Sequence, residues 1–232
     1  MRRLFSNTLY FSILFFSILL IDIFVKSSFE GISYRFITKT LVMTSLIIYY
    51  FLNQKEVIKK RLIFMSLALF SFLLGDIFLL LYQNFIPYII GMGFFVLGKL
   101  FYALRFSNQK DFKLSSLLPF IIFCFGFMLV LMNLIYDNLG NFFIPVMVYL
   151  FSCLIVTMFS FLRKDEVNFS SYVLVLIGIA FTIISDTIAV LQEFYMPDMA
   201  YHKVTIMLFY GLSQYFIVIG VVRENNTLIF DQ

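Results

Sequence analysis

The sequence predicts an all-α fold: a polytopic membrane bundle of eight transmembrane helices. Hydrophobic residues make up 62% of the 232 residues and charged residues 13%, with a mean hydropathy of +0.99. Soluble domains are nearer about 45–50% apolar and about 25% charged. Apolar stretches of about 20 residues recur along the whole chain, and a helix of that length covers the roughly 30 Å hydrocarbon layer of a bilayer. The alternating polarity of β-barrel strands is not seen in the sequence.

Short polar breaks separate the apolar stretches, among them VKSSFEG, NQKEVIKKR and EFYMPDMAYHK. Because every break is short, we expect residues 1–232 to form a single integral membrane domain. The expected spans are residues 9–25, 34–52, 62–82, 86–106, 115–135, 142–162, 170–191 and 203–222.

The lysines and arginines predict the orientation of the spans. One set of span ends carries Arg2, Arg3, Lys55, Lys59, Lys60, Arg61, Arg105, Lys110, Lys113, Arg163, Lys164 and Arg223. The opposite set carries only Lys26, Arg35 and Lys203. Because cytoplasmic loops are enriched in basic residues, both termini are expected in the cytoplasm, and a bacterial protein would lie in the cytoplasmic membrane. The net charge of +4 therefore reflects topology and does not indicate binding of nucleic acid.

Two stretches of the chain resemble each other at an offset of 110 residues. LLGDIFLLLYQNFIP, residues 73–87, aligns without a gap with IISDTIAVLQEFYMP, residues 183–197. Asp76 then matches Asp186, and Pro87 matches Pro197. The two stretches belong to the third and seventh spans, which run in the same direction. A duplicated unit of four helices is one interpretation of this pattern.

Charged residues inside the spans are the strongest functional signal. They are Asp22, Lys39, Asp76, Lys99 and Asp186. Lipid does not solvate such groups, so they are expected to face one another or a wet cavity. Tyr102, Ser185, Tyr210 and Gln214 are candidate polar companions. One interpretation is that the aspartates and lysines form ion pairs that only hold helices together.

The other interpretation is chemical. Carboxyl groups in an apolar setting are the arrangement in which one acid keeps its proton and another acts as a base. Nucleophile motifs, phosphate loops and metal-ligand clusters are not seen in the sequence, so the paired carboxylates are what remains for chemistry. Cys124 and Cys153 lie in apolar spans and read as buried hydrophobic residues. His202, the single histidine, is expected to be a surface residue in a loop.

Five short motifs follow one another in a recognisable order. They are ITKTL with Lys39, GDIFLLL with Asp76, FVLGKLFY with Lys99 and Tyr102, ISDTIAV with Asp186, and FYGLSQYFIVIG with Tyr210 and Gln214. From about residue 30 to 222 the chain resembles the YhhN family of eight-span membrane proteins, which includes the lysoplasmalogenases.

The resemblance implies an ether hydrolase that needs no cofactor. Its substrate would be a lysophospholipid from the bilayer, whose vinyl-ether bond is cleaved to a fatty aldehyde and a glycerophospho-alcohol. Asp76 and Asp186 fall on the family's paired aspartates and would be the catalytic acid and base. Lys39 or Lys99 would bind the lipid phosphate, and Tyr102, Tyr210 and Gln214 would contact the substrate.

The chain departs from the family pattern at two positions. Lys99 stands where the family usually has histidine, and Thr40 follows Lys39 where proline is usual. Two other functions fit the same residues. Intramembrane charges and a parallel repeat are also typical of a transporter for small solutes or protons. A non-catalytic membrane protein that binds lipid is the third class.

Overall fold

The computed structural model describes residues 5, 7–28, 32–81, 84–107 and 114–224. Within these ranges the chain folds into helices and contains no strand. Long apolar runs adopt this structure because a helix satisfies its own backbone hydrogen bonds where no water is present. The α-helices are α2 (Thr8–Ser28), α3 (Ile32–Asn53), α4 (Lys59–Leu79), α5 (Phe85–Phe106), α6 (Leu114–Leu139), α7 (Phe143–Leu162), α8 (Phe169–Phe194) and α9 (His202–Val222), with the 3-10 turns η1 (Gly140–Phe142) and η2 (Arg163–Asp165) on either side of α7.

Seven helical segments of the described residues are long and apolar enough to cross a membrane. The chain is thus an integral, multi-pass membrane protein. One segment, residues 120–162, is 43 residues long and contains most of α6 and all of α7. A straight helix of that length would measure about 65 Å, roughly twice the thickness of the hydrocarbon layer. Gly140 turns the chain inside this segment at a φ of 45°, a conformation that glycine adopts without strain.

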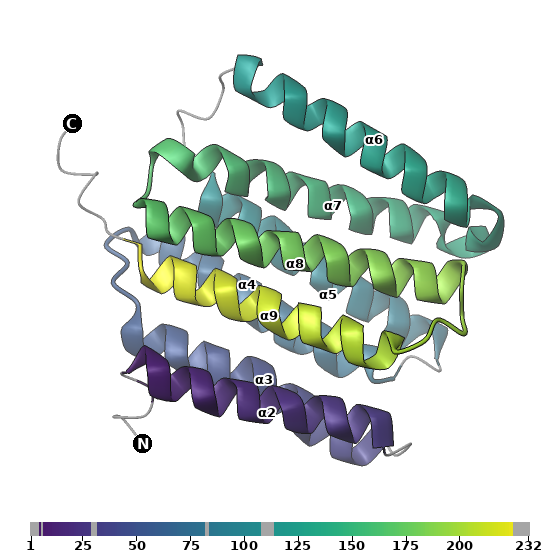
Figure 1. The fold of residues 1–232 in the computed structure, drawn as a ribbon, viewed down its shortest axis with the longest axis horizontal. Helices are drawn as coiled ribbons and strands as arrows, with labels where there is room; N and C mark the ends of the chain where they lie inside the picture. The colour runs from purple at the N-terminus through teal and green to yellow at the C-terminus, as the bar shows by residue number, and fades with distance from the viewer. Residues whose placement is uncertain (1–4, 6, 29–31, 82–83, 108–113, 225–232) are drawn as a thin grey trace.

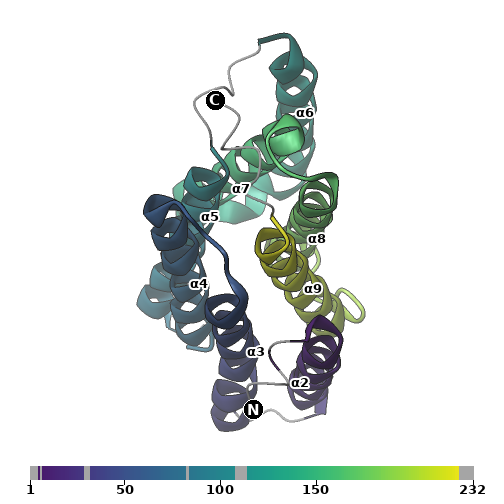
Figure 2. The same cartoon turned by 90° about the vertical axis from the view of Figure 1, so that its left-hand side faces the viewer.

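The helices run side by side, so their ends gather at two ends of the bundle (Figure 1). We call the end where α2 stops and α9 starts the cavity end, and the end where α2 starts and α9 stops the network end. Seen end-on in Figure 2, α4 and α5 face α8 and α9, while α2 with α3 and α6 lie at opposite edges. The most extensive helix packing is between α4 and α5 and between α8 and α9.

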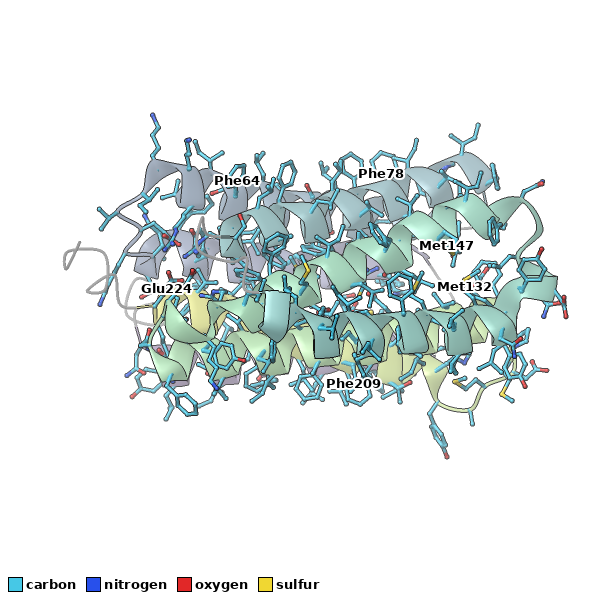
Figure 3. All side chains as sticks on the ribbon, turned by 90° about the horizontal axis from the view of Figure 1, so that it is seen from above. Phe64, Phe78, Met132, Met147, Phe209 and Glu224 are labelled. Atoms are coloured by element: carbon cyan, nitrogen blue, oxygen red, sulfur yellow. The ribbon has the colours of Figure 1, made fainter. Side chains whose placement is uncertain are left out.

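Large apolar side chains cover the outside of the bundle. On α6, Ile122, Phe125 and Leu129 are 65%, 68% and 70% exposed, and their spacing places them on one face of the helix. Phe64 and Phe78 lie on one side of the bundle and Phe209 on the other (Figure 3). A soluble protein rarely exposes so much apolar surface, whereas lipid solvates it well. The outer surface therefore supports the assignment to a membrane.

Glycine allows α8 and α9 to approach closely. A Cβ atom added to Gly178 would lie 2.8 Å from the carbonyl oxygen of Ser213 and 2.9 Å from the backbone nitrogen of Ile217. Both atoms belong to the backbone of α9, so they cannot turn aside. Small residues at such crossings are typical of membrane helix pairs. Gly93 in α5, by contrast, has no atom of the described residues within 4 Å of an added Cβ.

We expect Gly178→Ala to destabilise the bundle, because α8 and α9 must separate to accept the methyl group. Overpacking of this kind costs about 1–3 kcal/mol. The midpoint of thermal unfolding in detergent should therefore fall by several degrees. Gly93→Ala is the matched control and should leave the midpoint unchanged or slightly raised. Equal midpoints for the two variants would contradict the close packing described above.

A buried ion network closes the network end, where Figure 3 labels Glu224. The Glu224 carboxylate accepts hydrogen bonds from Arg61 at 2.9 Å and from Arg105 and Arg163 at 2.8 Å each. Arg105 also pairs with Glu56. Arg105 and Arg163 are 2% and 1% exposed, so their charges depend on these carboxylates. The network connects α4, α5, η2 and the end of α9.

Two opposing effects set the pKa of Glu224, which follows the last residue of α9. Burial alone would raise this pKa, because an apolar setting disfavours a charged carboxylate. The positive charges of Arg105, Arg163 and Arg61 outweigh burial and hold the pKa of Glu224 below its ordinary value of 4.5. A carboxyl with a lowered pKa stabilises the folded state above the pKa of the unfolded chain, and this contribution disappears as the pH falls through the folded value.

We therefore expect Glu224→Gln to lower the midpoint of thermal unfolding at pH 7, because two buried arginines lose their shared partner. The parent protein should lose stability as the pH falls below about 4.5, and Glu224→Gln should lose less over the same interval. Thermal unfolding in detergent between pH 7 and pH 3 measures both effects. Asp198→Asn, at an exposed position, is the control and should follow the parent at every pH.

Candidate functional site

The first buried carboxylate is Asp76 on α4, which is 1% exposed. The Lys39 ammonium of α3 lies 3.0 Å from its Oδ1. The Tyr210 hydroxyl of α9 donates a hydrogen bond of 2.8 Å to its Oδ2. Three helices therefore meet at this carboxylate. Both of its oxygens have a partner of suitable charge or polarity.

The second buried carboxylate is Asp186 on α8, which is 8% exposed. Lys99 of α5 donates to its Oδ2 and Tyr149 of α7 donates to its Oδ1, both at 2.6 Å. The Lys99 ammonium also lies 3.4 Å from the centre of the Tyr149 ring, a cation–π contact. The three side chains form a compact triangle. Lys99 is 1% exposed, so its ammonium is shielded from solvent.

Asp76 and Asp186 each contact one lysine and one tyrosine. The helix that supplies the lysine to one aspartate corresponds in the repeat to the helix that supplies the tyrosine to the other. Lys39 precedes Asp76 by 37 residues, and Tyr149 precedes Asp186 by the same 37 residues. On the other side, Lys99 and Tyr210 are 111 residues apart, close to the offset of 110 between the aspartates. Each aspartate thus receives one lysine and one tyrosine from corresponding helices. Polarity within the spans does not single out Tyr149, although its offset of 110 residues from Lys39 equals the offset between the two aspartates.

A cavity of about 930 Å³ opens at the cavity end of the bundle. Its volume is in the range of pockets that hold small ligands. Lys39 and Tyr149 line it, whereas Asp76, Asp186 and Lys99 do not. Each carboxylate is therefore one hydrogen bond or ion pair away from the cavity wall. The apolar part of the wall includes Leu79, Met92, Phe95, Val146, Val190 and Phe194.

The remaining predicted residues lie at different places in the bundle. Tyr102 donates a hydrogen bond of 2.8 Å to Gln214, and each is 1% exposed. Neither lines the cavity, so their contact with a substrate remains a prediction. Ser185 donates to the Ile206 carbonyl oxygen and joins α8 to α9. His202, expected in a loop, is instead the first residue of α9 and lines the cavity mouth.

Asp22 on α2 is a third buried carboxylate, with no exposed surface. Its Oδ1 accepts a hydrogen bond from Thr38, the residue before Lys39. Its charge acts on both Asp76 and Lys26. Asp22 therefore belongs to the electrostatic surroundings of the Lys39–Asp76 pair.

The arrangement differs from two carboxyl groups that share one proton. Asp76 and Asp186 are each compensated by their own lysine, so their charges are balanced separately. Among the described residues, no three histidine, cysteine, aspartate or glutamate side chains gather to form a metal site. What the arrangement offers chemically is two acid–base clusters, each with one member at the cavity wall.

The fold and these clusters define a class: integral membrane proteins of the helical-bundle type with acidic and basic groups buried in the interior. The model of the YhhN family matches residues 34–221 of the 232. The chain belongs to the YhhN family, and the resemblance noted in the sequence is confirmed. The match includes both aspartates, both lysines and Tyr210. Comparisons with curated proteins and with solved structures give no match.

We expect Asp186→Asn alone to be strongly destabilising, because it leaves the Lys99 ammonium buried without a countercharge. Breaking a buried ion pair in this way costs about 3–5 kcal/mol. The double variant Lys99→Met/Asp186→Asn removes both charges and should recover most of the lost stability. Thermal unfolding of the parent, both single variants and the double variant gives the coupling. Additive effects of the two substitutions would contradict the pairing seen here.

Proposed function

We propose that the protein is an intramembrane hydrolase that cleaves the vinyl-ether bond of lysoplasmalogens, releasing a fatty aldehyde and a glycerophospho-alcohol. One observation carries the proposal: a cavity with both apolar and polar walls, open at one end, leads to Lys39 and Tyr149, each of which contacts a buried aspartate. Membership of the YhhN family is consistent with a hydrolase.

The cavity suits a lipid with one hydrocarbon chain. Its wall combines leucine, methionine, valine and phenylalanine side chains, which favour an alkenyl chain by burial of apolar surface. A chain held there would place its vinyl-ether end near the polar side chains of the wall. The lipid would enter from the bilayer, where it is already dissolved.

The reaction needs an acid and an anion close together. Protonation of the alkene carbon farther from the ether oxygen gives an oxocarbenium ion. Water then adds to the carbon next to that oxygen and loses a proton, giving a hemiacetal. The hemiacetal collapses to the aldehyde, and the departing oxygen takes a proton to become the alcohol. The balance is one water consumed for each ether bond cleaved, as in glycoside hydrolysis by two carboxyl groups.

We assign one of the two roles, acid or base, to Asp76 and the other to Asp186. Each cluster then supplies one of the two groups that the reaction needs. Protons would reach the cavity through the group in front of each carboxyl, Lys39 in one cluster and Tyr149 in the other. The Tyr149 hydroxyl is suited to such a relay because it can donate one proton while it accepts another. Lys99 replaces the histidine usual in the family, and its role here is to balance the charge of Asp186.

The proposed topology has eight crossings in one membrane domain, with both termini in the cytoplasm. In support, α6 and α7 are separate helices joined by the turn at Gly140. We also propose that the bundle arose by duplication of a four-helix unit. The exchange of lysine and tyrosine around the two aspartates supports this origin, as does the pairing of α4 with α5 and of α8 with α9.

We expect purified protein in detergent to release aldehyde from a lysoplasmalogen, but not from the saturated-ether or ester analogue. Tyr149→Phe removes one hydroxyl and keeps the Lys99–Asp186 pair. It should lower turnover at least a hundredfold, in the range lost with an acid–base group. Lys99→Met/Asp186→Asn should be lower still. Tyr49→Phe is the control, since its hydroxyl contacts Thr8 at the network end.

Two outcomes would contradict the proposal. One is a folded Tyr149→Phe and a folded double variant that both retain more than a tenth of the parent turnover. The other is solute flux in proteoliposomes with no aldehyde from any lipid, which would indicate a transporter. Size-exclusion profiles and thermal midpoints show whether each variant is folded.

A further inference from the structure

The cavity mouth gathers the basic residues of its end of the bundle. Lys26 comes from the end of α2, Arg35 from the first turn of α3, and Lys203 from the start of α9. All three line the cavity. They are also the three lysines and arginines that the sequence places in the breaks at this end. Residues from three separate helices have therefore converged on one opening.

These positive charges lie close enough to repel one another. Arg35, Lys39 and Lys203 all act electrostatically on Lys26. Lys39 is compensated by Asp76, but neither Lys26 nor Lys203 forms an ion pair with a described carboxylate. Among the described residues that line the cavity, Glu193 is the one acidic residue. Like charges held together at an opening with apolar walls focus a positive potential that attracts anions.

We propose that Lys26, Arg35 and Lys203 form a binding site for the phosphate group of a single-chain phospholipid. The planar guanidinium of Arg35 suits two parallel hydrogen bonds to phosphate oxygens, and the two lysines add charge. The identity of the lipid rests on the proposed function; the phosphate site does not. Lys39 and Lys99, which the sequence suggested for phosphate, are instead engaged by Asp76 and Asp186.

The site also fixes the position of the bond to be cleaved. Arg35 and Lys39 are four residues apart on α3, so they share one face of the helix and are separated by about 6 Å along its axis. In a lysoplasmalogen, three glycerol carbons separate the phosphate from the vinyl ether. A phosphate held by Arg35 therefore places the vinyl ether at the depth of Lys39 and Tyr149. The hydrocarbon chain continues along the apolar wall.

Binding of a lipid that cannot be cleaved tests the site without any reaction. The probe is tritium-labelled 1-O-hexadecyl-glycerophosphocholine, and the protein is the full chain in a non-ionic detergent. Lys26→Gln/Lys203→Gln should weaken binding at least tenfold, the loss that corresponds to about one charge-assisted hydrogen bond. Lys26→Arg/Lys203→Arg should bind like the parent. Lys59→Gln/Lys60→Gln removes the same charge at the network end and should also bind like the parent.

Competition with unlabelled compounds identifies the chemistry that is recognised. 1-O-hexadecylglycerol lacks the phosphate, and glycerophosphocholine and inorganic phosphate lack the chain. All three should compete at least tenfold more weakly than the unlabelled probe. Equal competition by hexadecylglycerol would overturn the phosphate site, and equal competition by inorganic phosphate or glycerophosphocholine would overturn its assignment to a lipid. Equal probe affinity for the parent and Lys26→Gln/Lys203→Gln would overturn the site altogether.

The two proposals can fail separately. If the parent releases no aldehyde but Lys26→Gln/Lys203→Gln still weakens probe binding, the hydrolase assignment falls and the phosphate site stands. If the parent is active, this variant should raise KM at least tenfold and leave kcat within a factor of about two, because it removes binding made equally in ground and transition states. An active parent with an unchanged KM in the variant would overturn the phosphate site alone.

Discussion

The pairing of charges inside an apolar bundle is the constraint on which the rest of the structure depends. Lipid does not stabilise an isolated aspartate or lysine, so each buried charge needs a partner from another helix. The Lys39–Asp76 pair links α3 to α4, and the Lys99–Asp186 pair links α5 to α8. Tyr210 and Tyr149 bring α9 and α7 to the same two points. One cluster thereby joins α3, α4 and α9, and the other joins α5, α7 and α8.

The same pairing limits how the site can be changed. In the proposed hydrolase, a carboxylate at the centre of a cluster would serve both chemistry and helix packing. Removing it therefore changes both at once, unless the opposite charge is removed as well. The hydroxyl of Tyr149 is the exception, since the Lys99–Asp186 pair persists without it. A hydroxyl that lies beside an ion pair can be removed without leaving a charge unpaired. The proposed chemistry and the helix packing can therefore be changed separately within one cluster.

The sequence predicted the helices better than it predicted their contacts. Apolar length decides where a membrane helix runs, and the structure places helices at all the expected ranges, with ends that differ by a few residues. Which lysine pairs with which aspartate depends on how each helix is rotated about its axis and on which helices pack beside it. The hydropathy of the sequence gives no information on either. Tyr149 was overlooked because tyrosine is common near membrane surfaces, and only its spacing distinguishes it.

Charged residues are arranged differently at the two ends of the bundle. At the cavity end, cations from three helices surround an opening. At the network end, arginines and glutamates compensate one another in the interior, and Arg163 packs over the ring of Phe106. In the first arrangement, Lys26 and Lys203 form no ion pair with a described carboxylate, which is the basis of the proposed phosphate site. The second consists of ion pairs among protein side chains and lies across the interior at that end.

The interior of the bundle opens at the cavity end, and the ion network lies at the other end. In the proposed hydrolase, protons and water would reach the acid–base clusters through the cavity, which Lys39 and Tyr149 line. The clusters would then equilibrate with the acidity of one side of the membrane. If the pH differed between the two sides of the bilayer, the protonation of the clusters would follow the pH on the side of the cavity mouth alone.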